Sequence, residues 1–118
     1  MYEYKATMVK IVDGDTVDVS IDLGFDIQYN SRVRLYGINT PESRTRDLEE
    51  KKRGLAAKAR VEELVPVGSS VILRTQKDGK GKFGRILGMI FKDIYAEDSI
   101  NQMLVAEGHA VNYDGGKR

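Results

Sequence analysis

The chain lacks cysteine altogether, has a single histidine, His109, and carries almost no net charge. Without cysteine it can form no disulfide framework, no thiolate nucleophile and no cysteine-zinc site. His109 has no cysteine or second histidine as a metal partner, so we expect it to cap a helix end. A formal net charge of +1 does not indicate a nucleic-acid partner, so any such signal must be local.

Long apolar segments are also missing, because no run of residues approaches membrane length. The first five residues are not a basic stretch followed by an apolar run. We therefore expect an intracellular protein without a membrane partner, although a secreted protein whose leader had been removed would look the same. The 118 residues, 41% of them hydrophobic, fit a single domain over residues 1–118, which we expect to be a monomer.

Hydrophobic periodicity predicts the strands. Residues 16–23 alternate apolar and polar side chains, and residues 31–36 do so again, with Val33 and Leu35 on one face and Arg34 on the other. Strands are also expected at residues 6–12, 69–75 and 83–91.

Two helices are expected between and after these strands. Residues 47–65 are helical in composition, and a second helix starts at the Asp98-Ser99 cap and ends at Gly108. For the first helix we predict a buried stripe that consists of Leu55, Ala56, Ala59 and Leu64. The fold class is therefore α+β, mainly β: a barrel with helices packed against it.

Three short clusters carry the chemistry: Asp-Gly-Asp-Thr at residues 13–16, the run at residues 34–42, and Phe-Gly-Arg at residues 83–85. A phosphodiester is an anion that becomes more negative as it is attacked. Cleaving it calls for a divalent cation, guanidinium groups to hold the charge, and a carboxylate to activate water. These clusters can supply the carboxylates of Asp15 and Glu42 and the guanidinium groups of Arg34 and Arg85.

Each of these residues also has a simpler explanation. An aspartate beside a glycine, such as Asp15, is often a turn-former that bonds nearby backbone. Arg34 lies two residues from Arg32, so the two could be an exposed basic pair on a strand. Glu42 follows Pro41, which stops a strand, and could simply face solvent.

A basic run precedes the third cluster. Between Arg74 and Arg85, five basic residues stand against one acidic residue, which gives a local net charge of +4. Such a run is either a solvated hairpin tip or a funnel for phosphates. We predict the second, with nucleic-acid contacts from Lys77, Lys80 and Lys82. Tyr113 either packs against the domain or stacks on a base.

With these clusters, in this order, the chain resembles the staphylococcal nuclease (thermonuclease-like) family from about Tyr4 to about Tyr113. The resemblance implies a five-stranded Greek-key barrel of the OB-fold type, packed with two or three helices. It also implies calcium-dependent hydrolysis of DNA and RNA, preferably single-stranded or denatured, with low sequence specificity. The implied roles are calcium ligation by Asp15 and the Thr40 carbonyl, general base catalysis by Glu42, and phosphate binding by Arg34 and Arg85.

Asn39 departs from the family pattern, because the best-studied members carry a metal-binding aspartate at this place. An amide oxygen still ligates calcium, but without charge, so we expect weaker binding or use of Mn²⁺ or Mg²⁺. Asn39 thus leaves two alternatives open: an enzyme with another metal, and a non-catalytic module that binds nucleic acid or protein. The joint presence of Asp15, Arg34, Glu42 and Arg85 favours catalysis.

Overall fold

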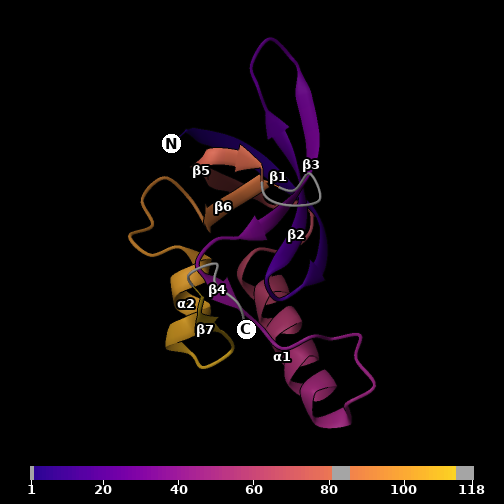
Figure 1. The fold of residues 1–118 in the computed structure, drawn as a ribbon. Helices are drawn as coiled ribbons and strands as arrows, with labels where there is room; N and C mark the ends of the chain where they lie inside the picture. Colours follow the sequence, from indigo (N-terminus) through magenta and orange to yellow (C-terminus); the bar gives the residue numbers. More distant parts are fainter. Residues whose placement is uncertain (1, 81–85, 114–118) are drawn as a thin grey trace.

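The computed structural model of the chain describes residues 2–80 and 86–113, without the side chains of residues 77–80. This part of the chain is mainly β, with two helices packed below a barrel (Figure 1). The elements are β1 Glu3–Asp13, β2 Thr16–Asp22, β3 Gln28–Leu35, β4 Ile38–Asn39, α1 Leu48–Leu64, β5 Ser70–Lys80, β6 Ile86–Phe91, α2 Ile100–Ala106 and β7 Val111–Asn112.

The barrel closes in the order β1-β2-β3-β6-β5, and β5 pairs with β1. All of its neighbouring strands are antiparallel except β3 and β6, which are parallel and align Val33 with Ile86. This arrangement confirms the predicted five-stranded OB-fold barrel with helices. A separate two-stranded sheet of β4 and β7, which the sequence did not predict, lies beside it.

The alternating strands bury one face, as predicted. In β2, Val17, Val19 and Ile21 are each at most 2% exposed, and in β3 the same holds for Val33 and Leu35. Side chains between them point outward, because successive residues of a strand face opposite sides of the sheet. Arg34 therefore leaves the barrel on its outer face, at the end of β3.

Helix α1 begins and ends where the sequence predicted. The Asp47 carboxylate caps it by accepting the backbone N–H groups of Glu49 at 3.1 Å and Glu50 at 3.2 Å. Neither described helix is long and apolar enough to cross a membrane.

The predicted buried stripe of α1 is largely wrong. Leu55, Ala56 and Ala59 are exposed, and of the predicted residues only Leu64 is buried. The buried residues are instead Gly54, Ala57, Val61 and Leu64. Their spacing of three and four follows one helical face, and it includes a glycine that an apolar count overlooks.

Helix α2 is fastened to the barrel by a buried amide. Ser99 caps the helix in a capping box with Gln102, as the Asp98-Ser99 signal predicted. The Asn101 side chain is 3% exposed; its amide donates to the carbonyl oxygens of Tyr36 at 2.9 Å and Gly88 at 3.3 Å. Its oxygen accepts the backbone N–H of Ile90 at 3.3 Å. One side chain thus joins α2, β6 and the segment that leaves β3.

An ion pair links the two helices on the surface. The guanidinium of Arg60 binds both carboxylate oxygens of Glu107, at 2.7 and 3.0 Å. This hydrogen-bonded pair lowers the pKa of Glu107 below its ordinary value.

Replacing Asn101 with Ala should cost about 2–4 kcal/mol in the free energy of unfolding, because buried backbone groups lose their partner. The measurement is the guanidinium chloride midpoint at constant slope. Asn30→Ala, at an exposed position of β3, is the matched control and should stay within about 0.5 kcal/mol of the parent. Equal midpoints for the two variants would contradict the assigned role of Asn101.

Candidate active site

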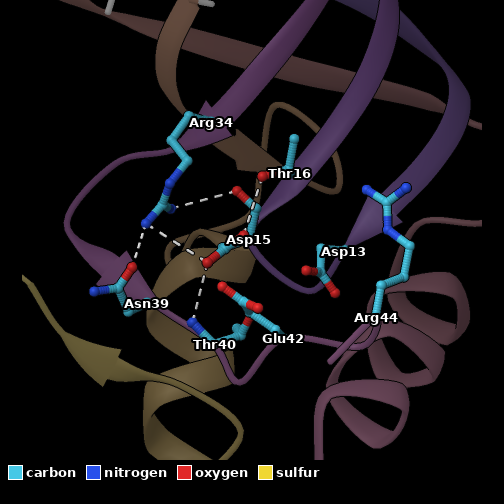
Figure 2. Close-up of a pocket in the computed structure, with 8 residues that line it drawn as sticks. All are labelled: Asp13, Asp15, Thr16, Arg34, Asn39, Thr40, Glu42 and Arg44. Atoms are coloured by element: carbon cyan, nitrogen blue, oxygen red, sulfur yellow. Dashed lines mark hydrogen bonds and ion pairs between the residues drawn. The ribbon is translucent and has the colours of Figure 1, made fainter. Parts of the chain in front are cut away.

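Three segments that are distant in sequence meet in one pocket at the outer face of the barrel. They are the β1–β2 turn, the end of β3, and the chain that runs from β4 toward α1 (Figure 2). The pocket has a volume of about 410 Å³, and it is lined by Asp13, Asp15, Thr16, Arg34, Asn39, Thr40, Glu42 and Arg44.

Strand pairing brings the first two segments together. Thr16 of β2 lies opposite Arg34 of β3, and the Leu35 N–H donates to the Asp15 carbonyl oxygen at 2.8 Å. The β1–β2 turn and the end of β3 therefore share one edge of the sheet. This backbone pairing alone is enough to place Asp15 next to Arg34.

The two aspartates of the turn hold the third segment. Asp15 accepts the Thr40 N–H on Oδ2 at 3.1 Å and the Thr16 hydroxyl on Oδ1 at 3.0 Å. Asp13 accepts the Ser43 N–H on Oδ1 at 3.2 Å. A simple turn-former would bond its own neighbours. Asp15 does bond its neighbour Thr16, but both carboxylates also reach backbone groups 25 and 30 residues away, and so build the pocket.

Arg34 lies at the centre of a network of acceptors. Its Nη1 donates to the Leu35 carbonyl oxygen at 2.9 Å and, more weakly, to that of Asp15 at 3.4 Å. Its Nη2 lies 3.5 Å from Oδ2 of Asp15 and donates to Oδ1 of Asn39. The side chain is only 14% exposed.

Arg32 lies on the same face of β3 and is an exposed basic residue of the strand, which Arg34 is not. It pairs with Asp18 directly across the strands at 2.8 Å, and its side chain is 47% exposed. The exposed basic residue on this strand is therefore Arg32, while Arg34 belongs to the pocket.

Glu42 lines the same pocket with an exposed side chain, and its backbone N–H donates to Oε2 of Glu50 at 3.2 Å. Figure 2 shows its carboxylate among the other acidic groups of the pocket. The pocket thus contains Glu42 and Asp15 together, which the sequence alone could not establish. Among the described residues, the Glu42 carboxylate has no hydrogen-bond or ion-pair partner, so a water molecule can reach it.

Two glycines allow this close assembly. A Cβ at Gly14 would lie 2.8 Å from Cβ of Ala57 and 2.9 Å from Oγ1 of Thr40. A Cβ at Gly54 would overlap the Glu42 carbonyl oxygen and lie 2.7 Å from the Ser43 nitrogen. Helix α1 therefore packs directly on the backbone that carries Glu42, at a distance only glycine permits.

Most of the remaining predicted site residues fall outside the described part of the chain. Arg85 and Lys82 fall outside the described residues, as do the side chains of Lys77 and Lys80. Tyr113 is half-buried, and its N–H donates to the Gly37 carbonyl oxygen at 2.8 Å, just after β7. It is not among the residues that line the pocket.

Three residues line the pocket although they were not predicted as site residues: Asp13, Thr16 and Arg44. Asp13 and Thr16 flank Asp15 in a motif that the sequence analysis did single out. Arg44 had no such signal, because Arg44 and Arg46 follow Glu42 in an irregular segment where no periodicity distinguishes their directions.

The oxygen atoms of the pocket fit a hard divalent cation. Asp15 and Asn39 both direct a side-chain oxygen at the same nitrogen, Nη2 of Arg34. Oxygen atoms from two segments of the chain thus surround one positively charged group. The described residues contain no group of three or more His, Cys, Asp or Glu side chains placed to hold a metal. A cation here would depend on amide, backbone and water oxygens besides carboxylate, which calcium accepts.

The lining of the pocket that the described residues form is slightly acidic, because the three carboxylates of Asp13, Asp15 and Glu42 outnumber the two guanidinium groups of Arg34 and Arg44. Its formal charge of −1 would repel a phosphodiester. One divalent cation would reverse that sign.

A comparison with protein families gives one match: the family model described as "Staphylococcal nuclease homologue" covers residues 32–117. The match includes Arg34, Asn39, Thr40 and Glu42, and it starts after Asp15, which strand pairing places beside them. No curated protein matches the chain.

The packing of α1 on the Glu42 backbone predicts an unusual sign for Gly54→Ala. In an ordinary helix interior this change stabilises by roughly 0.5–1 kcal/mol. Here the added methyl group must displace the backbone of Glu42 and Ser43, so we expect a loss of about 1–3 kcal/mol. Chemical denaturation measures this directly. A gain in stability would show that α1 does not pack closely against the backbone of Glu42 and Ser43.

Proposed function

This chain belongs to the staphylococcal nuclease homologue family, and on that premise we propose that it is a metal-dependent nuclease. Its substrates would be the phosphodiester bonds of DNA and RNA, cut with low sequence specificity. The observation that carries the proposal is the convergence of Asp15, Arg34, Asn39 and Glu42 on one pocket.

Calcium is the cation that we propose, held by Asp15, Asn39 and the Thr40 carbonyl oxygen. When bound, it would supply positive charge to polarise the phosphodiester and to acidify a water molecule. The shared contact of Asp15 and Asn39 with Arg34 Nη2 supports this ligand set. Asn39 brings no charge, so Mn²⁺ and Mg²⁺ are the other cations to test.

Glu42 is the proposed general base. Its exposed carboxylate lines the pocket, so a water molecule can hydrogen-bond to it while standing next to a bound phosphate. The proton passes from that water to Glu42 as the water oxygen attacks phosphorus. The P–O ester bond on the opposite side breaks, and the released alkoxide takes a proton from solvent. Asp15 is less suited to this role because both of its oxygens already accept hydrogen bonds.

Arg34 is the proposed stabiliser of the charge that develops on the phosphate. Its guanidinium is held in place by four acceptors, so it needs little reorganisation when that charge appears. The family resemblance assigns Arg85 the same task, and we retain it in the proposal. Lys77, Lys80, Lys82 and Tyr113 would contact the rest of a single or denatured strand, and the protein would act as a monomer.

The second candidate function is a non-catalytic module on the same barrel that binds nucleic acid or protein. The amide at Asn39 favours it, as does the lack of a three-acid metal cluster within the described part of the chain. The exposed carboxylate of Glu42 argues against it, since a binder of phosphates gains nothing from an acid in the pocket.

Glu42→Gln is the variant that tests catalysis best, because only the backbone of Glu42 is engaged and the fold should survive. We expect calcium-dependent hydrolysis of denatured DNA, lost on chelation and reduced roughly a hundredfold or more by Glu42→Gln. Glu62→Gln, an equal charge change at an exposed position of α1, should have no effect.

A reduction of only a few-fold by Glu42→Gln would remove Glu42 as the base. DNA binding without cleavage in calcium, manganese and magnesium would favour the non-catalytic module.

A further inference from the structure

Arg44 carries the second guanidinium group of the pocket. It differs from Arg34 in its exposure and in its hydrogen-bond partners. Arg34 is largely buried and engaged by Asp15 and Asn39. Arg44 lines the pocket with an exposed side chain. Within residues 2–80 and 86–113 it makes no side-chain hydrogen bond or ion pair. Its donors are thus available to a ligand.

The position of Arg44 is fixed by its neighbour. The Ser43 N–H donates a hydrogen bond to Asp13, and Gly54 of α1 packs closely against the Ser43 backbone. When an arginine on a flexible loop binds a ligand, the loop loses conformational entropy, and this loss weakens the binding. Here the backbone one residue earlier is already anchored, so Arg44 is presented to the pocket at low entropic cost.

Arg34 and Arg44 approach the pocket from two sides. Figure 2 shows the carboxylates of Asp13, Asp15 and Glu42 between the two guanidinium groups. Arg34 stands on the side of Asn39, where the proposed cation and the cleaved phosphate would lie. Arg44 stands beyond Asp13, on the side that leads toward α1.

We propose that Arg44 binds a phosphate of the nucleic-acid strand next to the one that is cleaved. This inference rests on the proposed function only in taking a phosphodiester strand as the ligand. A guanidinium suits a phosphate because it can donate two parallel hydrogen bonds to it. Its charge at the rim also offsets the acidic interior, which by itself would repel the strand.

The competing explanation is that Arg44 is only a solvated surface residue. Arg46 provides the matched control: it has the same side chain, lies two residues further along the same segment, and is exposed without lining the pocket. A general effect of positive charge would act equally through both arginines. A phosphate contact would act through Arg44 alone.

The test measures binding of a short fluorescein-labelled oligothymidylate by fluorescence anisotropy at a fixed calcium concentration, with Glu42→Gln as the parent protein so that the strand is not cleaved during the measurement. We compare the parent protein with Arg44→Gln, Arg44→Lys and Arg46→Gln over a range of salt concentrations. Arg44→Gln should weaken binding at low salt by about fivefold to tenfold, and should lower the slope of log K against log salt by about 0.7. Arg44→Lys should keep the slope, because the charge remains, and Arg46→Gln should match the parent.

The inference is overturned if Arg44→Gln and Arg46→Gln behave alike, or if the parent protein does not bind the oligonucleotide. If cleavage is measurable, the loss in Arg44→Gln should appear in KM and not in kcat. An equal loss in kcat would place Arg44 at the cleaved phosphate instead. Failure of the nuclease proposal gives a different result: no variant cleaves DNA, while the salt slopes still decide the role of Arg44.

Discussion

Two hydrogen bonds from backbone to carboxylate hold this site together. The N–H groups of Thr40 and Ser43 donate to Asp15 and Asp13, and so fasten the segment after β4 to the β1–β2 turn. The place of the third segment in the pocket depends on that attachment. It places Asn39 against Arg34, directs Glu42 and Arg44 to the same opening, and sets the backbone on which α1 packs through Gly54. A charged acceptor makes each of these bonds stronger than a bond between neutral groups.

The same attachment explains the electrostatic character of the pocket. It gathers the carboxylates of Asp13, Asp15 and Glu42 in one place, where Arg34 and Arg44 are the two guanidinium groups among the described lining residues. These described groups carry more negative than positive formal charge, which suits the cation that we propose. With a divalent cation bound, the pocket would present net positive charge to the phosphodiester, and Arg34 would already stand beside the place where negative charge develops.

Local patterns in the sequence were sufficient for most of the fold. Alternation in β2 and β3 predicted the buried faces, helical composition predicted α1, and the Asp98-Ser99 cap predicted where α2 begins. The β4–β7 sheet was missed because strands of two residues carry no periodicity. The buried face of α1 was misassigned because Gly54 is buried by the backbone of a distant segment and not by its own apolar character.

Motifs in the sequence predicted some of the residues that line the pocket, but not how they are brought together. The motifs identified Asp15, Arg34, Asn39 and Glu42, and spacing alone could not bring them together. That required the β2–β3 register and the long-range bonds of Asp13 and Asp15. Arg44 had to be found in three dimensions, because its neighbour Arg46 has the same sequence character and does not line the pocket.

The most direct test of the account is a calcium titration followed by ¹H–¹⁵N NMR, which reports binding without any substrate. We predict that the signals of Asp15, Thr40 and the Asn39 side-chain amide shift first, and that Asn39→Asp tightens calcium binding by about tenfold through one added ligand charge. The contrary result would be shifts confined to the acidic start of α1 around Glu49, with Asn39→Asp leaving the affinity unchanged. The convergence of Asp15 and Asn39 would then serve only to hold Arg34, and the site would not be a metal centre.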